Sequence, residues 1–320
     1  GYGSAKKIRS IVGSASTVNQ QTFAAVSAAS SGDILQGKVA GLQVFSSSGE
    51  PSTSVSMRIR GINSINASNA PLFILDGSPV ESTIFNALNP NDIETMTVLK
   101  DASSTAIYGS RAANGVIFIT TRKGKTEKAT VQASASYGLS NVANFSMDLM
   151  KSEECFSFRE TIMPALKDNA QFQKLKDFRI SNNIGTDWKE WILRSNAPTW
   201  KGDLSVSGRT NKTDYFVSLG AFNQTGVEYF SYLGRYNVRS NINVKVNDWL
   251  KVGVNITGTY QDYQTAGYST TGTGYYNPMN IAAWALPYAV PYEIKTDDSG
   301  KFIGYGEEQT YISDLGMQNY

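Results

Sequence analysis

Hydrophobic and polar residues alternate over residues 236–260, on both sides of a short turn. One set of alternate positions is apolar apart from Ser240 and Gly258, and comprises Tyr236, Val238, Ile242, Val244, Val246, Leu250, Val252, Val254, Ile256 and Tyr260. The other set is polar with one glycine, and comprises Asn237, Arg239, Asn241, Asn243, Lys245, Lys251, Gly253, Asn255, Thr257 and Thr259. Because successive side chains of a β-strand point to opposite faces, this period of two predicts a hairpin with one apolar face and one polar face.

The turn at residues 247–249 defines how the two strands pair. Pairing Val246 with Leu250 aligns the two apolar rows, whereas a shift by one residue would mix the faces. The same register sets Lys245 opposite Lys251, a like-charge pair that needs a hydrated or acidic neighbourhood.

The length of the hairpin fits a membrane. About ten residues at ~3.3 Å each, tilted by ~45°, span roughly 24 Å, which is the height of the apolar belt of an outer-membrane barrel. Trp249 would mark one edge of this belt, and Tyr236 and Tyr260 the other, as an aromatic girdle. The polar face is too polar for a packed interior, so we expect it to be hydrated. A soluble β-sandwich or adhesin hairpin would also alternate and is the alternative.

A second hairpin follows the same pattern. Pairing Val206 with Val217 leaves a turn at residues 210–213 and aligns two further apolar rows. Phe216 and Phe222 fall on the other face, which suggests that they rest against something that fills the lumen.

A further run of alternating apolar and polar residues covers residues 130–140 and predicts another strand.

The connections between the predicted strands alternate in length. Short connections occur at 210–213 and 247–249, and long ones at about 141–199, 223–233 and from 262 onward. Short turns on one side and long loops on the other are typical of outer-membrane barrels. Within the first long loop, Ser152 followed by two glutamates predicts the start of a helix.

Composition excludes several classes of function. The 320 residues are 18% charged with a net charge of +2, so nothing indicates a nucleic-acid partner. The chain has no histidine, which removes Ser-His-Asp and Cys-His catalysis and histidine metal sites. Cys155 is alone and cannot form an internal disulfide. We therefore expect neither an enzyme nor a cofactor.

Residues 1–125 follow a different pattern. Strands are predicted at 54–60, 72–75, 93–99 and 115–121, and short helices at 33–39 and 101–109. The runs at 72–75 and 116–119 are continuously apolar, as in strands buried on both faces. We expect a small α/β domain that acts as a plug for the barrel strands.

Specific segments of this domain resemble the plug of SusC-like (SusC/RagA-type) TonB-dependent outer-membrane transporters. These are LQGKVAGLQV at 35–44, RIRG at 58–61, PLFILDG at 71–77, NPNDIE at 89–94 and the run VLKDASSTAIYGSRAANGV at 98–116. The resemblance continues at TDW (186–188), DYFVSL (214–219) and NDWLKVG (247–253), so it extends over nearly the whole chain.

This resemblance implies a fold, a function and partners. It implies an α/β plug followed by antiparallel transmembrane β-strands, in a barrel of 22 strands. It implies TonB-dependent import of an oligosaccharide or oligopeptide across the Gram-negative outer membrane, with a SusD-like surface lipoprotein as a lid and TonB on the periplasmic side. Only about five barrel strands can be recognised in the sequence, which are too few to close a barrel. We therefore expect an N-terminal fragment, with the plug at 1–125 and the first strands and loops of the barrel at 126–320.

Three groups of residues are candidate sites. The amides of loop 63–69 (Asn63, Asn66 and Asn69) and the aromatic rings Tyr263, Tyr268, Tyr275, Tyr276 and Trp284 are candidate substrate contacts, although ordinary loop composition also explains them. Arg58, Arg60 and Arg111 are candidates for ion pairs between plug and barrel. The alternatives to a transporter are a non-transporting surface adhesin or binding protein, and a TonB-dependent signal transducer.

Overall fold

The computed structural model describes residues 15–20, 30–46, 49–51, 53, 55–59, 61, 69–100, 106–143, 148–265 and 284–308. The chain divides into two compact units. Unit 1 comprises residues 1–140, 197–226 and 231–264, and unit 2 comprises residues 141–196, 227–230 and 265–320.

The N-terminal part of unit 1, which we call the plug, is built on a five-stranded sheet. The strand order is β1 (Ala15–Asn19), β6 (Ile93–Leu99), β7 (Val116–Thr121), β4 (Leu72–Leu75) and β5 (Ser78–Val80). A separate hairpin pairs β2 (Leu42–Phe45) with β3 (Ser56–Ile59), and the short helical segments are η2 (Asp33–Leu35), α2 (Ser82–Ala87), η3 (Pro90–Asp92) and η4 (Ala106–Ala112). Phe85, Ile93 and Met96 are completely buried in the core.

The predicted plug strands are confirmed and the helices are shorter than predicted. The apolar runs form the central pair β4 and β7, which is parallel, as expected for strands covered on both faces. The helix predicted at 33–39 is a single 3-10 turn, because Gly37 adopts a positive φ of 70° and ends it. In η4 the backbone breaks at Gly109, where φ is 62°; residues 101–105 lie outside the described part.

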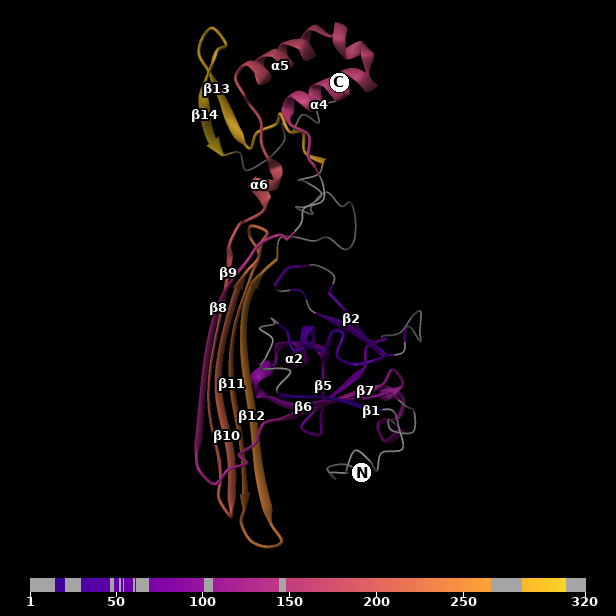
Figure 1. Cartoon of the computed structure of the whole chain (residues 1–320), viewed down its shortest axis with the longest axis vertical. Helices are drawn as coiled ribbons and strands as arrows, with labels where there is room; N and C mark the ends of the chain where they lie inside the picture. Colours follow the sequence, from indigo (N-terminus) through magenta and orange to yellow (C-terminus); the bar gives the residue numbers. More distant parts are fainter. Residues whose placement is uncertain are drawn as a thin grey trace. The chain divides into compact units, whose positions relative to one another are not determined.

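The second part of unit 1, the wall sheet, is an antiparallel meander of five long strands (Figure 1). These strands are β8 (Thr130–Ser140), β9 (Ala197–Arg209), β10 (Thr213–Thr225), β11 (Tyr232–Lys245) and β12 (Lys251–Gln264). Both predicted hairpin registers are confirmed: Val206 pairs with Val217, and Tyr236 pairs with Tyr260. Lys245 also pairs directly with Lys251.

One of the predicted long loops is shorter. The alternation of β10 and β11 continues further than expected, so the connection at 223–233 reduces to residues 226–231. Gly226 N donates to Ser231 O across it at 2.9 Å, which closes the connection as a compact turn.

Unit 2 contains the inserted loops. Its elements are α4 (Ser152–Ile162), η5 (Pro164–Asp168), α5 (Ala170–Ser181), α6 (Trp188–Ile192) and the hairpin of β13 (Tyr292–Thr296) and β14 (Phe302–Glu308). The helix predicted from Ser152 is confirmed, but its N-cap is Lys151 and not Ser152, and the Lys151 N–H donates to the Glu154 side chain at 2.9 Å. Phe156 stacks on Tyr288 in a small core of its own. None of the helices in the described part is long and apolar enough to cross a membrane.

Candidate functional site

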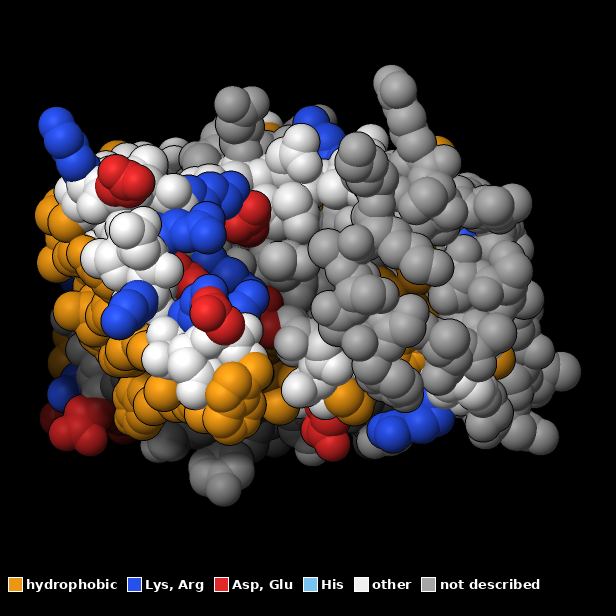
Figure 2. All heavy atoms as spheres, turned by 90° about the horizontal axis from the view of Figure 1, so that it is seen from below, with side chains coloured by type: hydrophobic (Ala, Val, Ile, Leu, Met, Phe, Trp, Pro, Cys, Tyr) orange, Lys and Arg blue, Asp and Glu red, His pale blue; other side chains and the backbone are white. Residues whose placement is uncertain are grey.

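The two faces of the wall sheet differ in exposure. On the outer face of β11, Tyr236, Val238 and Ile242 are 48%, 49% and 40% exposed. At the end of the sheet where the short turns lie, charged side chains gather beside this apolar edge (Figure 2). A contiguous exposed apolar face that extends along whole strands indicates contact with a partner or a membrane rather than with water.

The inner face of β11 is buried against the plug, so our expectation of a hydrated face was wrong for this strand, whereas the inner positions of β12 are exposed. Arg239 and Asn241 are each 1% exposed and Asn237 is 6% exposed. The polar side chains are tolerated there because they bond to the plug: Asn237 Nδ2, for example, donates to Ala87 O at 3.0 Å. Phe216 and Phe222 on the same face are buried as predicted.

An ion pair between Arg239 and Asp76 joins the wall to the plug. Arg239 Nη2 lies 2.5 Å from Asp76 Oδ2 and 2.7 Å from Thr121 Oγ1, while Nη1 donates to Thr257 Oγ1 at 2.8 Å. Thr121 in turn donates to Asp76 from both its N–H, at 2.9 Å, and its hydroxyl, at 2.6 Å. Asn241 adds bonds to Thr121 Oγ1 at 3.0 Å and to Arg122 O at 2.9 Å. We call this cluster the anchor.

Local sequence explains why Asp76 occupies this place. Asp76 and Gly77 form the tight turn between β4 and β5, with φ values of 47° and 93°. Asp-Gly is a favoured pair where both central residues of a hairpin turn need a positive φ. The turn therefore projects a carboxylate from the end of the plug sheet toward β11.

The turn at residues 89–92 provides a second set of plug–wall contacts. Asn89 Nδ2 and Asn91 Nδ2 donate to the two oxygens of Asp203, at 2.6 Å and 2.7 Å. Ser218 Oγ donates to Asp92 Oδ1 at 2.6 Å. Asn89 also caps η3 by accepting from Asn91 N, so the cap that shapes the turn holds the amides toward the wall. We call these contacts the seam.

Two glycines allow the plug to approach the wall closely. A Cβ on Gly220 of β10 would lie 2.4 Å from Asn89 Nδ2. A Cβ on Gly124, where the chain leaves the plug, would lie 1.8 Å from Gly208 O. Any larger residue would force the two layers apart at these points.

Burial changes the ionisation of two groups at the seam. Burial raises the pKa of Asp92, against the opposing effects of the Ser218 hydrogen bond and the Arg239 charge. Burial lowers the pKa of Arg122, whose guanidinium lies over the Phe216 ring at 5.0 Å from its centroid. Arg122 Nη2 also donates to Gln132 of β8 at 2.5 Å, so this residue links the plug exit to the wall.

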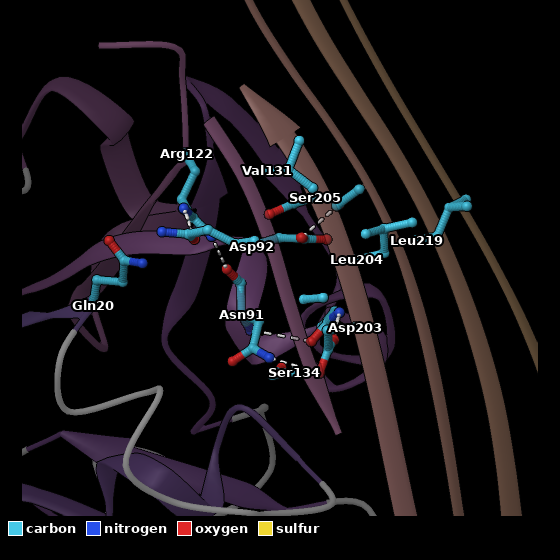
Figure 3. A pocket seen from close by; sticks show the side chains of 14 residues that line it. Gln20, Asn91, Asp92, Arg122, Val131, Ser134, Asp203, Leu204, Ser205 and Leu219 are labelled. Atoms are coloured by element: carbon cyan, nitrogen blue, oxygen red, sulfur yellow. Dashed lines mark hydrogen bonds between the residues drawn. The ribbon is translucent and has the colours of Figure 1, made fainter. Parts of the chain in front are cut away.

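A cavity of about 480 Å³ adjoins the seam (Figure 3). Its polar lining comes from the plug and from strands β8–β10, and includes Asn91, Asp92, Arg122, Ser134, Asp203 and Ser205. No cluster of acidic, cysteine or histidine side chains in the described part could hold a metal ion.

The predicted substrate contacts lie mostly outside the described residues. Asn63, Asn66, Tyr268, Tyr275 and Tyr276 belong to that group. Asn69 precedes β4, and Tyr263 and Trp284 are each 59% exposed. A role of these residues in binding stays a prediction.

The predicted arginines are not the ones that form the anchor. Arg58 lies over the Phe45 ring at 5.3 Å, Arg111 is exposed in η4, and Arg60 lies outside the described residues. In the described part, the ion pair between plug and wall has its cation on the wall and its anion on the plug. The sequence carried a signal for Arg239: it lies between Asn237 and Asn241 in an amide-rich inner row, and a buried cation needs a carboxylate.

The predicted girdle residues lie on the outer face. Tyr236 and Tyr260 are stacked across β11 and β12, with ring centroids 6.5 Å apart, and are 48% and 66% exposed. Trp249 is 82% exposed in the turn at the other end of the hairpin. This placement is compatible with a girdle, whose lipid contacts stay a prediction.

Comparison with known proteins identifies relatives of the whole described fold. Residues 7–116 match the TonB-dependent Receptor Plug Domain family. The TonB-dependent receptor P3 of Formosa agariphila is 37% identical over 277 residues, which are 86% of this chain and 26% of that protein. The TonB-dependent receptor SusC of Bacteroides thetaiotaomicron is 36% identical over 266 residues, 80% of this chain and 25% of that protein.

A solved structure described as the RagAB peptide transporter matches with a TM-score of 0.79 at 34% identity. The match covers 92% of this chain and 35% of that one. The chain spans about a quarter of the length of the two curated relatives.

Proposed function

We propose, from the premise that the chain belongs to the SusC-like TonB-dependent receptors, that it takes part in TonB-dependent import of a large nutrient across the outer membrane. The nutrient would be an oligosaccharide or an oligopeptide. A SusD-like surface lipoprotein would act as a lid, and TonB would supply energy from the periplasmic side. The protein would act by transport and not by catalysis.

One observation carries this proposal: a folded plug is attached by polar bonds to the inner face of a sheet whose outer face is apolar. An apolar outer face with tyrosines and a tryptophan at its ends suits a lipid bilayer. Hydrogen bonds to a plug can be exchanged for bonds to water or ligand at a small net cost, whereas an apolar core between plug and wall could not be opened so easily.

The relatives support the two candidate nutrient classes unequally. The structure with a TM-score of 0.79 is described as a peptide transporter, which favours an oligopeptide. The asparagine and tyrosine loops of this chain suit sugar hydroxyls as well as peptide groups, so both classes need testing.

Uptake in cells tests the proposal. Isogenic cells with and without the gene are given a fluorescent maltodextrin mixture or a fluorescent casein-digest mixture. We expect the cells with the gene to accumulate one probe, and a protonophore to stop accumulation while leaving surface binding intact. Equal accumulation in both strains, or accumulation that a protonophore leaves unchanged, would contradict the proposal.

A further inference from the structure

The anchor and the seam differ in strength. In the anchor, a buried guanidinium and a buried carboxylate bond to each other and to Thr121, so separating them would leave two charges without partners. In the seam, the bonds to Asp203 and Asp92 have neutral donors, namely two asparagine amides and one serine hydroxyl. The one charged donor beside them, Arg122, bonds to the neutral amide of Gln132 and not to a carboxylate of the wall. The seam is therefore the easier of the two to open.

The cavity beside the seam is large enough for part of a polar ligand. Its volume of about 480 Å³ lies within the usual range for ligand sites. Its polar lining combines carboxylate, amide and hydroxyl groups from both layers with the Arg122 guanidinium, and Val131, Leu204 and Leu219 add apolar surface. Figure 3 shows Asp92, Asn91 and Asp203 directed toward the interval between plug and wall. A cavity with such a lining holds water when no ligand is present.

The chemistry of the seam matches the groups of a sugar or peptide chain. Asp203 and Asp92 accept hydrogen bonds that a ligand hydroxyl or amide could donate instead. The amides of Asn89 and Asn91 could then donate to ligand oxygens. Each plug–wall bond would be replaced by a plug–ligand or wall–ligand bond, so opening would leave no polar group unsatisfied.

We propose that the cavity lined by the 89–92 turn and strands β8–β10 is a transit site for a hydroxyl- or amide-rich chain, which passes where the seam opens while the anchor holds the plug to β11. This inference rests on the proposed transport function and adds the route. It predicts that bulk placed in the cavity blocks passage without affecting binding at the cell surface.

The first test fills the cavity in the intact protein. Ser205 lines the cavity from β9, and Ser205→Trp should reduce accumulation of the transported probe to the level of cells lacking the gene. Surface binding of the same probe, measured with protonophore present, should stay unchanged. The matched control is Asn255→Trp, on the same face of β12 and outside the cavity lining, which should transport normally.

The three possible results distinguish the route, its location and the transport function. Normal accumulation by Ser205→Trp would overturn the route and leave the transport function standing, since the wild type still accumulates the probe. Equal loss in Ser205→Trp and Asn255→Trp would overturn the location. A wild type that accumulates neither probe would refute the function itself.

A second measurement keeps the test valid if Ser205→Trp does not reach the membrane. Ser205→Cys in a Cys155→Ala background carries a single thiol within residues 1–320, and the Cys155→Ala protein alone gives the background labelling. We expect a membrane-impermeant maleimide to label Ser205→Cys during energised uptake of the probe and not after protonophore treatment. Labelling that is independent of probe and energy would overturn the proposal.

Discussion

At the scale of single residues, the inner face of the wall depends on charges that are buried with their partners. Arg239 is 1% exposed and contacts Asp76, Thr121 and Thr257 together. A buried cation of this kind contributes little net stability as a pair, but removal of one partner leaves the other uncompensated. The consequence is a strong asymmetry between single and double substitutions.

Removing one partner of the anchor should therefore destabilise the protein more than removing both. Asp76→Asn and Arg239→Gln are each expected to lower the free energy of unfolding by about 3–5 kcal/mol. The double variant should cost less than the sum of the two. Denaturant unfolding of the detergent-solubilised protein measures all three, and strictly additive losses would show that the two side chains are not coupled.

Gly220 should tolerate no side chain. Gly220→Ala places a methyl group 2.4 Å from Asn89 Nδ2, and such overpacking costs about 1–3 kcal/mol. Gly202→Ala on β9 is the matched control, because nothing lies within 4 Å of its Cβ position. Equal unfolding midpoints for the two variants would refute the close contact between plug and wall.

The raised pKa of Asp92 should appear as a pH dependence of stability. Because burial raises its pKa above the ordinary 3.8, the folded state binds the proton more tightly than the unfolded state. The contribution of Asp92 to the free energy of unfolding is therefore fully present below pH 3.8, and it is lost as the pH rises through the pKa of the folded state. The free energy of unfolding is measured for the wild type and for Asp92→Asn across this pH window. We expect the value for the wild type to fall relative to that of Asp92→Asn as the pH rises.

The exposed Asp298 supplies the control for that comparison. Asp298→Asn removes one exposed carboxylate and controls for the loss of a charge. Within residues 1–320 the sequence contains no histidine to titrate between pH 5 and 8. A constant difference between wild type and Asp92→Asn would contradict the assignment.

At the scale of elements, the strands and their registers were predictable and their partners were not. The period of two and the lengths of two turns were sufficient for the pairing of Val206 with Val217 and of Tyr236 with Tyr260, because this information is local. The anchor joins residues 163 positions apart, and no local pattern encodes such a contact. The inner row of β11 was therefore interpreted as hydrated when it is covered by the plug.

Replacing one lysine of the like-charge pair at the end of the β11–β12 hairpin should stabilise the protein. Lys245 faces Lys251 directly, and Asp248 lies 2.5 Å from the Lys245 ammonium. Lys251→Glu should raise stability by about 0.2–1 kcal/mol, and the gain should shrink at high salt. Thermal unfolding at two salt concentrations measures this. The same gain in Lys128→Glu, whose side chain is not part of the pair, would indicate an effect of net charge alone.

At the scale of the whole molecule, the transport that we propose requires the plug to shift against the wall. A covalent link across the seam should prevent this shift. Asp92→Cys and Ser218→Cys replace side chains whose polar atoms lie 2.6 Å apart, and Cys155→Ala removes the native thiol. We expect a short bifunctional thiol reagent to abolish the probe accumulation that this variant shows without reagent, and to leave each single cysteine variant at its own untreated level. Full accumulation by the cross-linked protein, with the link verified by peptide mapping, would contradict movement at the seam.

The strand order of the wall sheet also has a consequence for how the protein folds. Each strand from β8 to β12 pairs with its neighbours in sequence, so the sheet can grow by adding one hairpin to the next. The plug must instead pair β1 with β6 and β4 with β7 across long intervening segments, and closing such loops is slow. In a wall sheet that has formed before the plug covers it, Asn237, Arg239 and Asn241 would face water. The amide-rich inner row of β11 therefore limits the apolar surface that the unfinished sheet exposes on its inner side.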